Sequence, residues 1–305
     1  MTATLPPILC VGAQKGGVGK SSVAANIAIN IAARGRRVLA VDGDQQGDLT
    51  SNNLGVPRDQ QDNGQGLGAA LQFGAKLEPY RGIRPNLDVV MGGAALALLV
   101  SSSQLAAEAG IDLADNLRAA LTELCSRESY DLIVIDSGHS NVTLVLALLQ
   151  VCSHLIIPTR EDEASIDGVR RMAASYRMAK KRGSQISLLG VVLFDVNPRA
   201  TNRNKEVDEQ IADMLDGSGI EPFSVAIRHA AGPARAERLR HLSAEELVNA
   251  ASQDKSARIT ALREGRSTDA ARLRPSDPIG LANDYQELTR QVLIRLSQSM
   301  AASAS

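Results

Sequence analysis

The residues best suited to chemistry form a glycine-rich run near the start of the chain. Residues 15–21 read Lys-Gly-Gly-Val-Gly-Lys-Ser and follow an apolar segment. Glycines lack a Cβ atom, so successive backbone N–H groups can converge on phosphate oxygens at the start of a helix. Lys20 can place its ammonium on β- and γ-phosphates, and Ser21 can offer a hydroxyl to Mg²⁺. We therefore expect nucleotide phosphates to contact Gly16, Gly17, Val18, Gly19, Lys20, Ser21 and Ser22.

The first half of this run departs from the general phosphate-binding loop. That loop reads Gly-x-x-x-x-Gly-Lys-Ser/Thr, whereas here Gln14 stands at the first glycine and Lys15 follows it. A lysine this early cannot easily turn back onto phosphates that its own loop wraps. Lys15 is better placed to reach out of the subunit.

Acidic residues follow two of the apolar runs. Asp42 and Asp44 end the second run, two residues apart, so one carboxylate can join the water shell of a metal ion while the other orients an attacking water. Asp136 ends the run Asp131-Leu-Ile-Val-Ile-Asp136, where a buried carboxylate would hold a Mg²⁺-bound water. We interpret His139, just beyond it, as a solvated loop histidine. The expected metal-side residues are Ser21, Asp42 and Asp136, and the expected catalytic residues are Lys15, Lys20 and Asp44.

The hydrophobic pattern predicts the sheet that would bring these residues together. Short apolar runs alternate with helix-like segments, which is typical of an α/β fold with a mostly parallel sheet flanked by helices on both faces. The continuous apolar run 132–135 indicates burial on both faces. A helix is expected over Ser21–Arg34, with Gly35 at its C-terminal cap. The predicted strands are Ile8–Ala13, Arg37–Asp42, Leu87–Met91, Leu132–Asp136, His154–Pro158, Leu188–Phe194 and Pro222–Ile227.

Two stretches lack a clear period. Residues 55–80 are expected to be loop with a short helix, and residues 243–280 a surface insertion, partly helical and partly mobile. The four-residue spacing of apolar side chains predicts an amphipathic C-terminal helix over 283–300. We expect one P-loop domain over residues 1–305.

The loop and the carboxylate segments resemble the ParA/MinD family of ATPases, which carries the same early lysine in a deviant Walker A motif. In that family the lysine reaches the nucleotide of the partner subunit across a sandwich dimer. The resemblance therefore implies ATP-driven dimerisation, with Lys15 as a clamp on transition-state charge. Asp44 falls on the family's water-orienting aspartate, and Gln46 and Gly47 also match.

The sequence departs from the family pattern in two loops. Gln45 replaces a proline and Asp48 an asparagine, and Ser137-Gly138 stands where the family has a proline-containing switch. Replacing proline by glycine is expected to loosen the segment that senses the γ-phosphate.

The second half of the chain extends the resemblance over most of residues 8–242 and 281–300. Residues 154–168 match a strand–Pro–x–x–x–Glu–x–x–Ala–x–x–Gly element, with Asp162 at the Glu position, and residues 190–202 match a strand and arginine loop. The resemblance implies a basic, dimer-spanning surface that binds DNA without sequence preference. Ala231 occupies the place of a second family arginine. The candidate DNA-binding residues are Arg199, Arg203, Arg228 and Arg235.

Composition limits the remaining classes. The 305 residues carry a formal net charge of −1, and only 2% are aromatic, so any DNA affinity should come from phosphate contacts rather than stacked bases. Cys10, Cys125 and Cys152 lack metal-ligand spacing, which disfavours an iron–sulfur electron donor. No signal-peptide pattern or membrane-length apolar run is visible, so we expect the cytoplasm. The nucleotide strand begins near residue 8, so no N-terminal helix-turn-helix is expected.

The sequence thus predicts a ParA-like ATPase with ATP and Mg²⁺ as cofactors. It would dimerise on ATP, bind nonspecific DNA at the nucleoid, and respond to a ParB-like or other cargo adaptor in plasmid or chromosome partition or cargo positioning. A MinD-like membrane-associated ATPase is one alternative, although the tail Ala-Ala-Ser-Ala-Ser offers no bulky anchor. A P-loop small-molecule ligase or synthetase is the other. Cargo, partner and base contacts stay open.

Overall fold

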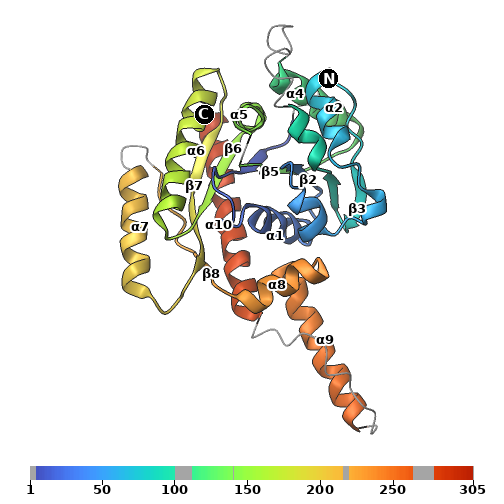
Figure 1. The fold of residues 1–305 in the computed structure, drawn as a ribbon, viewed down its shortest axis with the longest axis vertical. Coiled ribbons are helices and arrows are strands. Elements are labelled where there is room, and N and C mark those ends of the chain that lie inside the picture. Colours follow the sequence, from blue (N-terminus) through green and yellow to red (C-terminus); the bar gives the residue numbers. More distant parts are fainter. Residues whose placement is uncertain (1–4, 100–111, 140, 216–219, 264–277, 305) are drawn as a thin grey trace.

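A single eight-stranded sheet runs through the computed structural model, which describes residues 5–99, 112–139, 141–215, 220–263 and 278–304 (Figure 1). Its strand order is β3-β4-β2-β5-β1-β6-β7-β8. Neighbouring strands are parallel except β3 and β4, which pair antiparallel at one edge. The strands are β1 (Ile8–Val11), β2 (Val38–Gly43), β3 (Tyr80–Arg84), β4 (Leu87–Val90), β5 (Leu132–Ser137), β6 (His154–Thr159), β7 (Ser187–Val196) and β8 (Ile227–Arg228).

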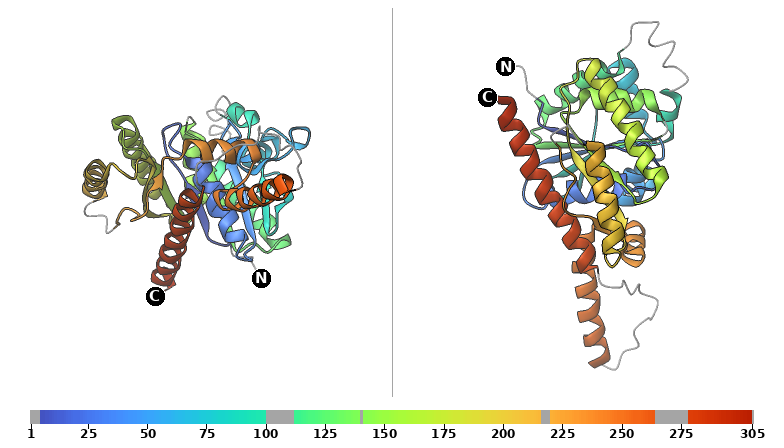
Figure 2. Two further views of the ribbon diagram at one scale, coloured as in Figure 1. Left: turned by 90° about the horizontal axis from the view of Figure 1, so that it is seen from below. Right: turned by 90° about the vertical axis from the view of Figure 1, so that its left-hand side faces the viewer.

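Helices cover both faces of this sheet, as the sequence predicts. One core contains side chains of α2 (Gln65–Phe73), α4 (Leu113–Arg127), α5 (Val142–Val151), α6 (Glu163–Lys181) and α7 (Thr201–Leu215). The other contains side chains of α1 (Lys20–Ala32), α9 (Ala244–Arg263) and α10 (Ile279–Ala304). Figures 1 and 2 show α10 running along its face while α9 extends away from the sheet. The remaining elements are η1 (Leu49–Leu54), η2 (Arg58–Gln60), η3 (Ala94–Ala97) and α8 (Ala231–Arg240).

The residues of β1 show why this strand is central. Ile8 and Cys10 point into one core and Leu9 and Val11 into the other, and all four are buried. Strands with helices on both faces need apolar side chains at every position. The same reasoning accounts for the confirmed strands β2, β4, β5, β6 and β7, whose bounds differ from the predicted ones by one or two residues at most ends.

Register places the predicted acidic residues at one edge of the sheet. Val11, the last residue of β1, lies opposite Asp136 of β5. Asp42 of β2 lies opposite Asp136 on the other side. The loop that follows β1 and both carboxylates therefore share the carboxyl edge, where open α/β sheets bind ligands.

Several predicted boundaries were wrong. The strand expected over Pro222–Ile227 is reduced to Ile227–Arg228. Phe223 donates one backbone hydrogen bond to Val191, at 2.9 Å, but its segment continues no ladder, and its neighbour Pro222 has no N–H to give. The edge strand β3 was missed because its five residues include an exposed glycine and two arginines.

The C-terminal part is more helical than expected. Helix α10 begins at Ile279 and ends at Ala304, rather than spanning 283–300. Within the expected insertion at 243–280, residues 244–263 form α9, and residues 264–277 lie outside the described part of the chain. The segment 55–80 contains a short helix, α2, as predicted.

The three cysteines are free thiols, and Cys10 and Cys152 are buried. No helix of the described residues is long and apolar enough to cross a membrane.

Candidate functional site

The glycine-rich loop joins β1 to α1 and takes a shape that requires glycine. Gly17 and Gly19 have positive φ angles, 76° and 84°, which favour a residue without Cβ. A Cβ atom on Gly19 would also lie 2.4 Å from the ring of Phe194. Helix α1 begins directly after Gly19, which has no side chain to cap the first turn. Its free N–H groups and the positive end of its dipole therefore face the loop, as an anion site requires.

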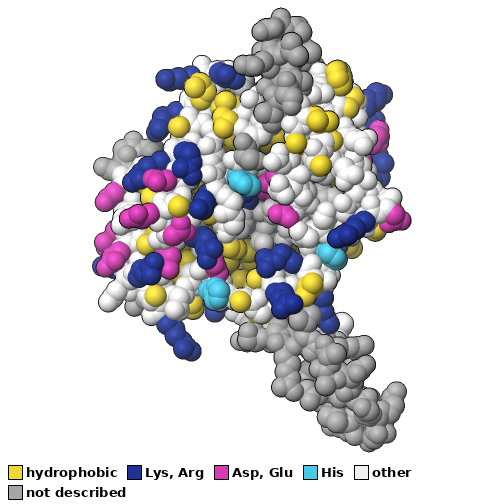
Figure 3. Space-filling view, viewed as in Figure 1, with side chains coloured by type: hydrophobic (Ala, Val, Ile, Leu, Met, Phe, Trp, Pro, Cys, Tyr) yellow, Lys and Arg dark blue, Asp and Glu magenta, His cyan; other side chains and the backbone are white. Residues whose placement is uncertain are grey.

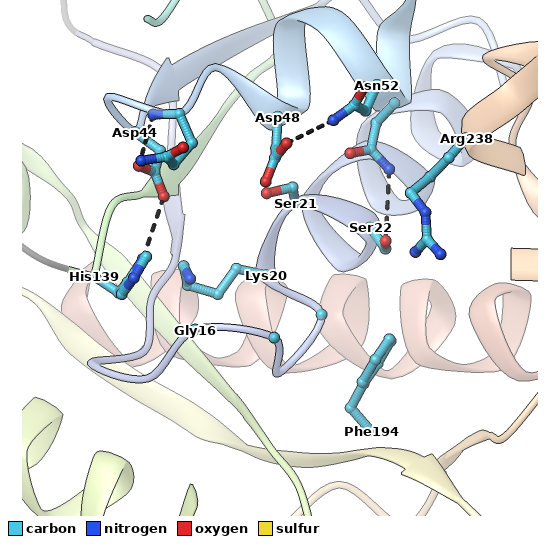
Figure 4. A pocket seen from close by; sticks show the side chains of 14 residues that line it. Gly16, Lys20, Ser21, Ser22, Asp44, Asp48, Asn52, His139, Phe194 and Arg238 are labelled. Carbon is cyan, nitrogen blue, oxygen red and sulfur yellow. Dashed lines mark hydrogen bonds and ion pairs between the residues drawn. The ribbon is translucent and has the colours of Figure 1, made fainter. Parts of the chain in front are cut away.

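Lys20 and Ser21 begin α1 and line the pocket above the loop (Figure 4). The Lys20 side chain is buried, and its Nζ lies 3.4 Å from the carbonyl oxygen of Lys15. This long hydrogen bond is the one that Lys20 Nζ makes among the described residues, so the ammonium keeps donors for phosphate oxygens.

Asp136, near the end of β5, is a neighbour of both residues. It is fully buried, and neither carboxylate oxygen has a hydrogen-bond partner among the described residues. Burial raises its pKa well above the ordinary value, and the charge of Asp42 adds to that rise, while Lys20 and Ser21 oppose it. A buried carboxylate with free oxygens beside a serine hydroxyl fits the oxygen ligands that Mg²⁺ and its water shell prefer.

The carboxylate of Asp42, unlike that of Asp136, accepts several hydrogen bonds. Its Oδ2 accepts hydrogen bonds from the Thr50 backbone N–H at 2.8 Å and the Thr50 hydroxyl at 2.7 Å, and its Oδ1 accepts one from the Asp44 N–H at 3.2 Å. Burial raises its pKa to about 6, opposed by those hydrogen bonds. Asp42 thus anchors the turn between β2 and η1, and it does not line the pocket formed by the described residues.

Asp44 points into the pocket from that turn. Its Oδ1 accepts a hydrogen bond from the Gln46 N–H at 3.0 Å, which fixes the carboxylate, and its Oδ2 lies 3.6 Å from Nδ1 of His139. His139 lies in a loop with its side chain 35% exposed, as the sequence predicts, and its ring packs over Gly16 and lines the pocket (Figure 4).

Lys15 lies on the far side of the loop, against α6. A Cβ atom added to Gly168 of α6 would lie 2.9 Å from the Cβ of Lys15. Hydrogen bonds from Ser165 lower the pKa of Asp162, and the charge of Lys15 adds to that lowering. Lys15 is not among the described residues that line the pocket of its own chain.

The pocket also contains residues that the sequence analysis did not assign to the nucleotide site. Phe194 comes from the end of β7, Arg238 from α8, and most of the others from the segment after β2 (Figure 4). No short motif joins these residues, since elements nearly two hundred positions apart supply them. The added lining residues are Gln46, Asp48, Asn52, Asn53, His139, Phe194 and Arg238.

The candidate DNA-binding arginines differ in their surroundings. Arg199 and Arg235 are exposed, and Arg203 is exposed with Glu161 3.4 Å away. Arg228 is instead paired with Asp284 of α10 through two side-chain hydrogen bonds of 2.6 and 2.7 Å. Figure 3 shows Lys and Arg side chains around the middle of the face that carries the pocket, with acidic side chains among them toward one edge.

A mostly parallel sheet with a glycine loop and buried carboxylates at its carboxyl edge is the architecture of a P-loop ATPase. The family model for an AAA domain matches residues 7–188, so the chain belongs to that family, whose relatives here are of the ParA/MinD type.

Two relatives and one solved structure illustrate the likeness. The chromosome-partitioning ATPase Soj of Thermus thermophilus is 32% identical over 181 residues, which are 59% of this chain and 66% of Soj. The chromosome partitioning protein ParA of Myxococcus xanthus is 29% identical over 68% of this chain and 71% of its own. An ATP complex of McdA from Cyanothece shares the fold with a TM-score of 0.72 at 17% identity, covering 95% of this chain and 97% of McdA.

Proposed function

We propose that this protein is a nucleotide-switched ATPase that positions DNA or another cargo. ATP and Mg²⁺ would join two copies face to face, the dimer would bind DNA without sequence preference, and a partner protein would stimulate slow hydrolysis that releases it. The observation that carries this proposal is the separation of the two loop lysines. Lys20 faces the pocket of its own chain, while Lys15 lies outside that pocket.

The chemistry follows from the side chains around the loop. Loop N–H groups and Lys20 would hold the phosphates, while Ser21 and Asp136 would hold Mg²⁺ and its waters, with Asp42 keeping the neighbouring turn in place. The bound metal would neutralise charge on the phosphates. Asp44 would orient the attacking water through Oδ2, because Gln46 already occupies Oδ1. Lys15 of a second copy would add positive charge at the transition state, as an arginine finger does.

Dimerisation can be tested with Lys15→Ala. We expect this variant to bind ATP with the affinity of the unchanged protein but to stay monomeric in light scattering and to lose stimulated turnover. Lys20→Ala is the matched control, since it should lose ATP binding itself. A Lys15→Ala variant that still dimerises with ATP would remove the role in trans.

Asp44→Ala tests the hydrolytic step separately. This variant should bind ATP and dimerise, yet remain in the ATP form because water is no longer oriented. Its complex with DNA should therefore outlast that of the unchanged protein. Normal ATP turnover by Asp44→Ala would exclude Asp44 from the mechanism.

DNA binding is best measured with ATP, ADP and no nucleotide across a salt series. We expect DNA binding with ATP but not with ADP or without nucleotide. The logarithm of the affinity should fall linearly with the logarithm of the salt concentration, and the slope should become shallower by about 0.9 for each DNA phosphate that the protein no longer neutralises. Arg199→Ala and Arg203→Ala should each make that slope shallower. The proposed nucleoid association follows from such binding, whereas the proposed ParB-like partner is supported by the similarity to ParA relatives. ATP-dependent binding to anionic vesicles instead of DNA would favour a membrane switch.

A further inference from the structure

The loop fixes the direction in which a nucleotide lies in the pocket. Lys20, Asp44 and His139 stand together at one end, where a γ-phosphate and its attacking water belong (Figure 4). The chain of phosphates then passes the first turn of α1, so the nucleoside must leave past Ser22. Phe194 and Arg238 line the pocket at this second end.

Phe194 offers an aromatic face where most other lining residues are polar. Its ring lies directly against Gly19, in the space that a Cβ there would need. Because Phe194 also lines the pocket, the ring contacts the loop on one side and the open space on the other. The chain has three Phe and no Trp, so an aromatic ring at this place is not a consequence of abundance.

A strained backbone turns Phe194 toward the pocket. The pairing of β7 with β8 shifts register between Phe194 and Val196, and Asp195 between them has a positive φ of 64°. Such a bulge re-aims the neighbouring side chains. Asp195 is held in this conformation by an ion pair with Arg160 and by the ring of His229, whose Nδ1 lies 2.6 Å from its Oδ1.

Arg238 approaches the same space from α8. Its side chain is exposed, and among the described residues none holds its guanidinium in a hydrogen bond or ion pair. The helix beneath it is nevertheless fixed, because buried Glu237 accepts a hydrogen bond from Asn26 of α1 at 3.3 Å. Asn26 also accepts a hydrogen bond from the Ala244 N–H at 2.9 Å, which joins the start of α9 to α1.

We propose that the base of the bound nucleotide stacks between the ring of Phe194 and the guanidinium plane of Arg238. Aromatic rings and arginine planes both stack on bases. This clamp rests on the nucleotide binding in the proposed function and is independent of the dimer and DNA steps. Since every base has a π face, stacking does not distinguish adenine from guanine by hydrogen bonds, whereas larger purines gain more than pyrimidines.

The test is a calorimetric titration of the Mg²⁺ forms of ATP, GTP, CTP and tripolyphosphate. Phe194→Leu keeps the apolar contact with Gly19 but removes the π face, and Phe194→Tyr keeps both. We expect Phe194→Leu to lose about fivefold or more in affinity for ATP and GTP alike, from the usual free energy of stacking. Phe194→Tyr should bind like the unchanged protein, and tripolyphosphate should bind every Phe194 variant equally.

Arg238→Lys keeps the positive charge without the plane, so it should lose affinity for ATP but not for tripolyphosphate. Arg240→Ala, on the same helix but outside the pocket lining, is the control and should change neither. Equal loss of tripolyphosphate would make Arg238 a phosphate ligand and overturn the clamp, as would full ATP affinity in Phe194→Leu. If the unchanged protein bound neither ATP nor tripolyphosphate, the proposed function itself would fail.

Discussion

Buried Glu237 makes the stability of the fold depend on pH. It is 5% exposed, and burial raises its pKa from 4.5 to about 7, opposed by the hydrogen bond from Asn26 and the charge of Arg238. In the folded protein Glu237 therefore holds its proton up to near-neutral pH, while in the unfolded chain it ionises near 4.5. Unfolding releases a proton between these two values, so stability from this group is complete below about pH 4.5 and is lost as the pH rises to about 7.

The size of the loss follows from the shift. Each pKa unit corresponds to about 1.4 kcal/mol, so moving the pKa from 4.5 to about 7 costs roughly 3 kcal/mol of the free energy of unfolding once Glu237 is ionised. Glu237→Gln removes the titration and keeps an oxygen that can accept the hydrogen bond from Asn26. The variant should match the unchanged protein near pH 5 and become more stable by about 2 to 3 kcal/mol at pH 8.

The assay is urea unfolding followed by far-UV circular dichroism at several pH values between 5 and 8. Glu206→Gln on the exposed face of α7 removes one negative charge without burial and controls for net charge. A difference between Glu237→Gln and the unchanged protein that does not vary with pH would refute the reasoning. So would a difference that grows toward acid, since the sign of the linkage would then be reversed.

Three further substitutions test the site. Thr50→Val removes the hydroxyl that donates to Asp42 and accepts from the Gly92 N–H at 3.0 Å, and urea unfolding should show a loss of about 1 to 3 kcal/mol; an unchanged midpoint would contradict this anchor. Gly19→Ala should abolish ATP binding in a titration, because the loop must change shape to admit the methyl group beside Phe194, and retained affinity would argue against the loop geometry. Asp136→Asn should weaken ATP binding with Mg²⁺ but not without it, and equal effects in both titrations would exclude a metal-side role.

The fold and the phosphate end of the site could be predicted because they follow local rules. Strands such as β1 and β5 are apolar at nearly every position, and burial on both faces of a parallel sheet demands that pattern. The residues of the phosphate-binding loop, 15–21, are consecutive in the sequence, so the loop can be recognised without knowing the tertiary structure. The carboxylates end predicted strands, and parallel strands bring their ends to one edge.

The nucleoside end of the pocket could not be predicted in this way. Phe194 stands in a run that reads as an ordinary buried strand, and its aim depends on the bulge at Asp195, which involves Arg160 and His229 just beyond the ends of two other strands. Arg238 belongs to a basic stretch in which several arginines have the same local character. The position of α8 relative to the pocket is set by the buried hydrogen bond between Glu237 and Asn26, more than two hundred positions apart.

The segment after β5 has glycine at Gly138 where the family has a proline-containing switch. We expected this glycine to loosen the segment, but it also has a structural role. Proline at Gly138 could not donate the backbone hydrogen bond that Gly138 makes to the Gly43 carbonyl at 3.2 Å. A Cβ on Gly138 would lie 3.2 Å from that same oxygen and 3.4 Å from Cα of Asp44, so glycine lets the segment pack closely against the turn after β2. The close approach puts the His139 ring beside the Asp44 carboxylate. The segment that we expected to sense the γ-phosphate therefore places a polar ring beside the residue expected to orient water.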